Sequence, residues 1–104
     1  MTYQDITVII TSFHSGDKIF DCINSIDKNV KIIVVENSND ENLKKEIYSK
    51  YKNVKCILSK ENLGYGSANN LALAKTNTNY ALIINPDVVL SDEALKNFFL
   101  TVKK

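Results

Sequence analysis

The feature that most constrains the fold is a set of four short apolar segments, rich in β-branched residues, that recur along the chain. They are DITVIITSF (5–13), VKIIVVEN (30–37), VKCIL (54–58) and NYALIIN (79–85). Runs such as VII, IIVV and LII lack the polar alternation of half-exposed strands, which is typical of strands covered on both faces. Each segment is therefore predicted to be a buried β-strand.

Helical patterns separate these segments. The second pattern follows Ser38-Asn39-Asp40-Glu41, which has the S-x-x-E form of a capping box, so we expect Ser38 to cap a helix there. Residues 61–75 predict a polar, glycine-bearing loop that runs into a third helix, and Ser91 can cap a last one. The apolar faces of the first, second and last helices are Ile19, Phe20, Ile23 and Ile26; Leu43, Ile47 and Tyr51; and Leu95, Phe98, Phe99 and Val102.

This alternation of strands and helices favours a parallel sheet with helices on both faces and right-handed crossovers. The fold class predicted is therefore α/β: a Rossmann-like three-layer α/β/α sandwich whose mainly parallel sheet has about four strands. The chain has 104 residues and is 44% hydrophobic, which is enough to bury one core. We expect a single domain over residues 1–104.

Composition excludes several partners. The net charge is only +1 and the lysines are spread along the chain as if on solvated faces, so no basic field indicates a nucleic-acid or membrane-surface partner. The apolar runs are far too short for a membrane span, and no basic start precedes the first of them. Cys22 and Cys56 form no C-x-x-C motif and are expected to be buried thiols, which favours a cytoplasmic protein.

Polar residues gather where the predicted strands end. In open α/β sheets, ligands bind outside the carboxyl ends of the strands, near the point where the strand order reverses. The opposite ends carry mostly Lys, Asn and Asp in ordinary turn contexts. The residues at the carboxyl ends are Thr11, Ser12 and His14; Glu36 and Asn37; Asn62 and Gly64; and Asn85 and Asp87.

Taken singly, each of these residues has a purely structural interpretation. Residues 36–37 could begin a turn, Gly64 and Gly66 could permit a tight start to the helix, and Asp87 after Pro86 could form a turn. Asn69 could either cap the third helix internally or face a ligand. The single histidine, in the loop after the first strand, has no visible carboxylate partner and reads as incidental.

Taken together, they indicate a site for a nucleotide diphosphate lying across the strand ends. Asp87 supplies a hard oxygen at the mouth of a buried strand, and Mg²⁺ or Mn²⁺ prefers such ligands and shares its shell with substrate phosphates. Glu36 and Asn37 can hydrogen-bond a base or a ribose. Asn62 and the backbone of residues 64–66 allow a ligand to approach closely.

Four motifs in order carry a resemblance to a known family. VIITSF, IIVVENSND, NLGYGSANNLAL and ALIINPDVVL resemble the family 2 glycosyltransferases with the GT-A fold, in their rhamnosyltransferase-like bacterial branch. The resemblance covers residues 5–100. It implies a site for a nucleotide-diphosphate sugar donor and a role in cell-surface polysaccharide biosynthesis.

The resemblance also implies roles for single residues. Residues 85–87 stand where the family keeps its D-x-D motif, with Asp87 as the ligand of Mg²⁺ or Mn²⁺. The remaining donor-site residues are Thr11 and Phe13 at the base pocket, Glu36 as the acidic residue that reads the base with Asn37 beside it, Asn62, Gly64 and Asn69 near ribose and phosphate, and Asn85 within the D-x-D position.

Two departures from the family pattern matter. Asn85 replaces the first acid of D-x-D, so the metal shell has one carboxylate fewer. The family's catalytic base lies in a following half, and no residue here matches it. We therefore interpret residues 1–104 as the truncated N-terminal, nucleotide-binding half of an inverting transferase that cannot transfer sugar alone. The alternative is a standalone nucleotide-sugar-binding module without catalysis.

Truncation also predicts an exposed sheet edge at the fourth strand, which a second copy of the chain could cover as a homodimer.

Two other α/β classes fit less well. The first is a small flavodoxin-like or receiver domain. Receivers need acidic residues after the first strand, where this chain has Thr-Ser-Phe. Nucleotidyltransferases that make sugar nucleotides want a glycine-rich and basic loop there, and TSFHSGDK offers one Gly and one Lys.

Overall fold

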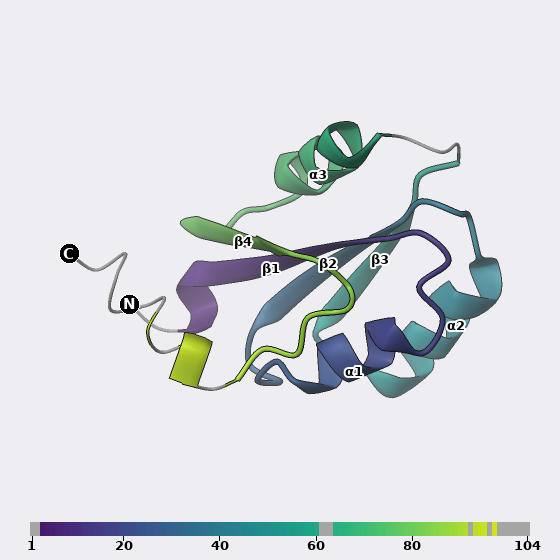
Figure 1. Ribbon diagram of the computed structural model, residues 1–104. Coiled ribbons are helices and arrows are strands. Elements are labelled where there is room, and N and C mark those ends of the chain that lie inside the picture. Colours follow the sequence, from purple (N-terminus) through teal and green to yellow (C-terminus); the bar gives the residue numbers. More distant parts are fainter. Residues whose placement is uncertain (1–2, 61–63, 92, 96, 98–104) are drawn as a thin grey trace.

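The computed structural model describes residues 3–60, 64–91, 93–95 and 97. Within them, four strands form one parallel sheet in the order β3-β2-β1-β4 (Figure 1). The strands are β1 (Ile6–Ser12), β2 (Lys31–Glu36), β3 (Val54–Leu58) and β4 (Tyr80–Ile84). The helices are a short 3-10 turn η1 (Tyr3–Asp5), α1 (Lys18–Asn24), α2 (Glu41–Lys50) and α3 (Tyr65–Ala74). The predicted α/β class with a parallel sheet is confirmed.

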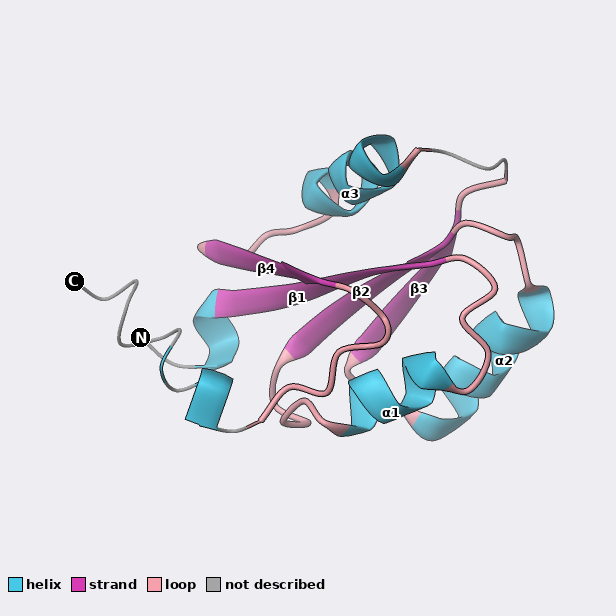
Figure 2. Ribbon diagram, viewed as in Figure 1, coloured by secondary structure: helices cyan, strands magenta, loops and turns pink. Residues whose placement is uncertain are grey.

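Helices cover both faces of the sheet. Figure 2 shows α1 and α2 on one face and α3 on the other. The first face holds the larger core, centred on Ile10, Ile32 and Ile47, and the second holds a smaller one that includes Ile9 and Ala72. β1 is buried along its whole length because it lies between two strands and two helical layers. None of the described helices is both long and apolar enough to cross a membrane.

The two outer strands are less covered than the inner pair. In the described part of the chain β4 pairs only with β1, and Tyr80 and Ile83 on it are 38% and 39% exposed. This agrees with the expected exposed edge at the fourth strand. The burial predicted for every segment holds for β1 and β2, holds only in part for β3, and is wrong for β4, whose residues are exposed or half-buried because an outer strand has a neighbour on one side only within the described residues.

The start of α2 differs from the prediction. Asp40, rather than Ser38, is the N-cap, and its Oδ1 accepts a hydrogen bond of 3.1 Å from the backbone N–H of Leu43. The hydroxyl of Ser38 instead donates to the carboxylate of Glu36. The predicted capping box is therefore wrong, because the buried charge at Glu36 takes the hydroxyl that the box would have used.

The end of the chain is described only in part. Ser91 Oγ accepts from the N–H of Ala94 at 3.0 Å, as a helix cap does, and Leu95 is buried. Phe98, Phe99 and Val102, which the sequence placed on the same face, lie outside the described residues.

Both cysteines are free and buried, as predicted. Burial raises the pKa of each thiol to about 11, so both are protonated and neutral near pH 7.

Candidate functional site at the carboxyl ends of β1 and β4

The strand order places a switch point between β1 and β4. The chain leaves β1 through α1 and reaches β2 on one side, whereas it reaches β4 on the other side from β3 through α3. The two crossovers cover opposite faces of the sheet (Figure 1). The loops that follow β1 and β4 therefore lie next to each other at the same edge of the sheet, which is where open α/β sheets bind ligands.

These two loops, with Lys18 of α1, line an open pocket of about 380 Å³, which we call the switch-point pocket. Both loops turn from the sheet towards α1 (Figure 1). The side chains that line the pocket comprise an aromatic ring, an imidazole, an ammonium group and a carboxylate. The lining residues are Phe13, His14, Ser15, Lys18, Asn85, Pro86 and Asp87.

The loop after β1 makes a sharp reversal. His14 and Gly16 both have left-handed backbone conformations, with φ of 49° and 58°, and α1 begins two residues later at Lys18. Glycine adopts this conformation without steric cost, whereas a histidine there is uncommon. The reversal leaves Phe13 50% exposed, with its ring edge-on to that of His14 at 4.5 Å between centroids. An apolar ring is thus held at the pocket.

The loop after β4 is a turn fixed against α1. The N–H of Val88 donates to the carbonyl of Asn85 at 3.1 Å, with Pro86 at the second position, where its fixed φ suits the turn. The thiol of Cys22 donates to the same carbonyl at 3.8 Å. Further along, the N–H of Leu90 donates to Ser25 Oγ at 2.8 Å. The turn presents Asp87 to solvent on the pocket lining.

The carboxylate of Asp87 acts electrostatically on the buried thiol of Cys22. Burial is the main cause of the raised pKa of Cys22, and the carboxylate of Asp87 raises it further. Lys18 also lines the pocket, and within the described residues no ion pair joins it to Asp87. The pocket therefore offers one cationic and one anionic group that form no ion pair with each other, so both can interact with a ligand.

Glu36 is placed differently from the prediction that it faces a base. Its side chain is 0% exposed, and its carboxylate accepts from the N–H and hydroxyl of Ser38 and from the N–H of Asp40, at 2.7–3.1 Å. The carboxylate thus closes the turn between β2 and α2, and it does not line the switch-point pocket. A direct contact with a base stays a prediction and requires these bonds to be exchanged.

Three other predicted site residues join elements beneath the rim. Thr11 Oγ1 donates to Asn69 Oδ1 at 2.8 Å, and this buried pair ties β1 to α3. The N–H of Asn37 donates to the carbonyl of Ser12, and its Oδ1 accepts from the hydroxyl of Ser59. These contacts hold the carboxyl ends of β1 and β2 and the end of β3 in register.

Two predicted residues lie in the segment before α3. Gly64 is the N-cap of α3, and a Cβ added there would meet no atom of the described residues within 4 Å, so the space beside it is open to them. Asn62 lies outside the described residues.

Of the predicted residues that the structure describes, it gathers Phe13, Asn85 and Asp87 in one pocket. It adds Lys18 and His14, which sequence reasoning did not assign to the site. Lys18 follows Gly16-Asp17 at the start of α1, and a basic residue opening a helix just after the first strand was the available signal. The position of His14 depends on its left-handed backbone, which no pattern in the sequence announces.

The residues present suit a metal shared with a ligand rather than a metal held by protein alone. Among the described residues no three His, Cys, Asp or Glu side chains cluster as a metal site. Asp87 supplies one carboxylate, and Asn85 on the same pocket supplies an amide. Mg²⁺ is usually bound by one or two carboxylates with substrate phosphates and water, so this donor set fits that mode.

The fold and the position of the pocket define an open α/β domain of the class that binds ligands at the carboxyl ends of a parallel sheet. The sequence matches the family described as glycosyl transferase family 2 over residues 7–104, and the chain belongs to that family. A search of curated proteins found no match.

Two solved structures share the fold. The crystal structure of S. aureus TarS 1-349 superposes with a TM-score of 0.76 at 24% identity, covering 95% of this chain and 32% of that one. The crystal structure of S. aureus TarS gives a TM-score of 0.77 at 24% identity, with 95% and 19% covered. The chain thus spans about a third of the first and about a fifth of the second.

Proposed function

We propose that the chain binds a nucleotide-diphosphate sugar in the switch-point pocket and is the donor-binding half of an inverting family 2 glycosyltransferase. The observation that carries this is the pocket itself, where loops after β1 and β4 bring together the exposed ring of Phe13, the ammonium of Lys18 and the carboxylate of Asp87. Membership of glycosyl transferase family 2 supports a nucleotide-sugar donor.

Each of these groups suits one part of such a donor. The Phe13 ring offers an apolar face on which a planar base can stack. Lys18 offers a point charge to the diphosphate. Asp87 would hold Mg²⁺ or Mn²⁺, with Asn85 as a neutral neighbour. When bound, the cation offsets the charge on the departing diphosphate.

The buried contacts support the site from below. We propose that Thr11 with Asn69 and Glu36 with Asn37 fix the strand ends on which the base and ribose rest. Gly64, with open space beside it, lets the nucleotide approach the start of α3, and Asn62 is proposed to act beside it. Free, neutral thiols are compatible with the reducing cytoplasm, which is the location we propose.

We further propose that this chain binds the donor without transferring sugar by itself. Asp87 is the one carboxylate on the pocket in the described part of the chain, and it is assigned to the metal. Apart from His14, which reads as incidental, no described residue on the pocket is left as a base for an acceptor hydroxyl. Sugar transfer to any ordinary acceptor, such as a short glycan or a polyol, would contradict this part of the proposal. A standalone nucleotide-sugar-binding module remains the alternative, and cell-surface polysaccharide biosynthesis in bacteria is the setting that the motifs favour.

The binding proposal is tested by isothermal titration with UDP, GDP and dTDP, each with and without Mn²⁺. One nucleotide should bind with saturation, and Mn²⁺ should tighten that binding by about tenfold or more. Asp87→Asn should remove the metal effect, whereas Asp21→Asn, an exposed carboxylate on α1 away from the pocket, should leave it unchanged. Equal binding with and without Mn²⁺ in all three proteins would contradict the assignment of Asp87.

In the part of the chain that the structure describes, no strand pairs with the outer edge of β4, and this supports the homodimer that the sequence suggested. Tyr80 and Ile83 are partly exposed on this strand, and an unpaired edge invites pairing with another chain. Sedimentation at high concentration should show a dimer that Ile83→Lys weakens. A monomer at every concentration would dismiss it.

A further inference from the structure

A continuous basic surface lies away from the switch-point pocket. A pocket of about 650 Å³ is lined by Lys44, Lys55, Lys60 and Lys75. A second pocket shares Lys55 and Lys75 with the first and adds two further lysines, at positions 31 and 52. Because pockets that share lining residues adjoin, the two form one groove.

The groove continues into a third pocket. Lys52 and Asn53 line both the second and the third, which adds Lys28 and Lys50. We call the lysines of these three pockets the lysine band. The band holds eight of the thirteen lysines, whereas the sequence had suggested lysines spread over solvated faces. They come from segments far apart in the chain and meet only in the fold.

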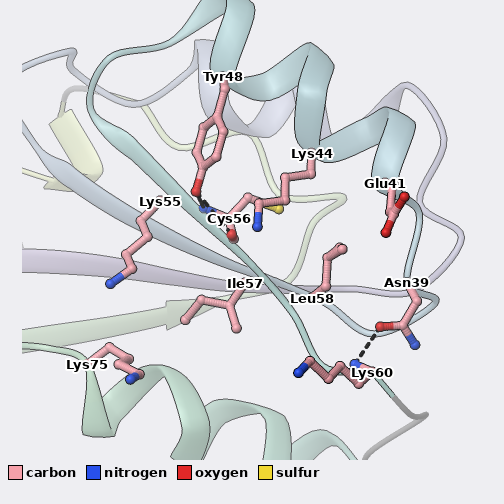
Figure 3. Close-up of a pocket in the computed structure, with 10 residues that line it drawn as sticks. All are labelled: Asn39, Glu41, Lys44, Tyr48, Lys55, Cys56, Ile57, Leu58, Lys60 and Lys75. Atoms are coloured by element: carbon pink, nitrogen blue, oxygen red, sulfur yellow. Dashed lines mark hydrogen bonds between the residues drawn. The ribbon is translucent and has the colours of Figure 1, made fainter.

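Figure 3 shows how the first pocket is built. Lys44 comes from α2 on one side and Lys75 from the end of α3 on the other, while Lys55 and Lys60 belong to β3 and the segment that follows it. The free edge of β3 is the floor between the two helices (Figure 3). The ammonium groups therefore border a trough rather than a flat face.

The charge of the band is almost uncompensated. The one ion pair among the described residues joins Lys50 to Glu46, so the other seven lysines of the band form no ion pair with a described carboxylate. Among the described residues that line the three pockets, Glu41 is the only acidic one. Like charges placed side by side raise the free energy of the chain unless an anion joins them.

The groove is not built for a polypeptide strand. Tyr48 Oη accepts from the N–H of Cys56 and donates to its carbonyl, at 3.1 Å each, so the middle of the free β3 edge is already occupied. An added strand needs those groups. Ammonium groups donate but cannot accept, whereas a peptide backbone brings N–H groups that need acceptors.

The groove offers few aromatic rings to nucleic-acid bases. Single-stranded nucleic acids stack their bases on free aromatic rings. Here Lys44 lies over the ring of Tyr48 at 5.8 Å, and the ring of Tyr51 stacks with Phe20 at 6.5 Å between centroids. Tyr48 keeps 49% of its surface exposed, so the band offers one half-exposed ring beside eight ammonium groups, and charge is the main means of recognition.

We propose that the lysine band binds a linear polymer of phosphate groups that carries no bases. Such a chain offers acceptor oxygens at every repeat, which is what a row of donor-only lysines requires. None of the residues that line the switch-point pocket lines the band, so the two sites are separate on the chain. Binding at the band thus stands whether or not the nucleotide proposal holds.

The test uses inorganic polyphosphate as the probe, with polyglutamate and oligothymidylate of matched charge as comparisons, in fluorescence or calorimetric titrations of the whole chain. Polyphosphate should bind most tightly, and its affinity should fall steeply as salt rises. Lys55→Gln with Lys75→Gln should weaken it by roughly tenfold and reduce the salt dependence by roughly one contact for each lysine.

A matched pair of variants on α2 controls for general charge. Lys44 lines the first pocket and Lys45, the next residue, lines none of the three. Lys44→Gln should weaken polyphosphate binding several-fold, and Lys45→Gln should change it less than about twofold. Equal losses in both variants, no saturable binding, or tighter binding of polyglutamate or oligothymidylate would each overturn the proposal.

Discussion

Two carboxylates lie at the same edge of the sheet, and one is buried while the other is exposed. Glu36 ends β2 and is fully buried, with hydrogen bonds from Ser38 and Asp40. Asp87 follows β4 and is exposed on the switch-point pocket. Both were candidates for a ligand on the same sequence argument, an acid at the end of an apolar strand. In the structure the turn binds the first carboxylate, and only the second is exposed.

The difference comes from the donors that follow each acid. After Glu36 the chain turns back so that two N–H groups and a hydroxyl converge on the carboxylate. At Asp87 the preceding residue is a proline, which has no N–H, and the turn is closed by the Asn85 carbonyl rather than by the acid. An acid at a strand end is thus available to a ligand only where the local turn does not consume it.

The largest effect that tests this comparison is on stability. Glu36→Gln replaces an acceptor-only carboxylate with an amide whose NH₂ group faces N–H and hydroxyl donors. Loss of charge-assisted bonds at a buried site should reduce the free energy of unfolding by about 2–3 kcal/mol. Urea denaturation measures it, with Glu46→Gln, which is exposed on α2, as the control. A loss below about 0.5 kcal/mol would mean that Glu36 is not a structural carboxylate.

A smaller loss is expected where β1 meets α3. Thr11→Val keeps the shape of the side chain and removes the hydroxyl that donates to Asn69. Asn69 is then left buried without this partner, which should cost about 1–2 kcal/mol in the same urea experiment. If Thr11 acts by contact with a base instead, Thr11→Val will weaken nucleotide binding while stability stays unchanged.

The mildest effect on stability should come from Asp87→Asn. The carboxylate is exposed, and the turn is held by backbone and α1 contacts, so the free energy of unfolding should change by less than about 0.5 kcal/mol. Paired with the loss of the metal effect on binding, this result separates a ligand-binding acid from a structural one. A loss as large as that of Glu36→Gln would erase the contrast.

The pKa of each cysteine thiol depends on a different one of the two carboxylates. Burial is the largest cause of the raised pKa of both thiols. The charge of Asp87 raises the pKa of Cys22 further. At Cys56 the charge of Lys44 lowers the pKa and that of Glu36 raises it. Removing a negative charge favours the thiolate, so Asp87→Asn should lower the pKa of Cys22 slightly and leave Cys56 unchanged. Alkylation rates against pH, followed by mass spectrometry, measure both, and a shift at Cys56 instead would contradict the geometry.

The raised pKa values of the two thiols also determine how the stability of the fold changes at alkaline pH. The folded chain holds each thiol proton more tightly than a model thiol of pKa 9.0, with a pKa of about 11. This contribution to stability is present below pH 9 and is lost as pH rises towards 11.

The strands and their parallel arrangement could be predicted from the sequence because full burial demands continuous apolar runs such as IIVV in β2. The edge that carries the site followed from the strand alternation and the switch-point rule. The fate of Glu36 could not, because the hydroxyl of Ser38 had two possible partners and only the folded turn decides between them. The sequence analysis also missed Lys18 and the lysine band. Whether a residue lines a pocket depends on which distant segments of the chain meet in the fold, and the sequence pattern does not show this.

The most direct test of the central claim is amide chemical-shift mapping by NMR with the nucleotide diphosphate that binds and Mg²⁺. The largest shifts should fall on residues 13–18 and on Asn85, Asp87 and Val88, the two loops that enclose the switch-point pocket. Shifts concentrated along α2 and β3, or shifts of equal size over the whole sheet, would contradict donor binding between β1 and β4.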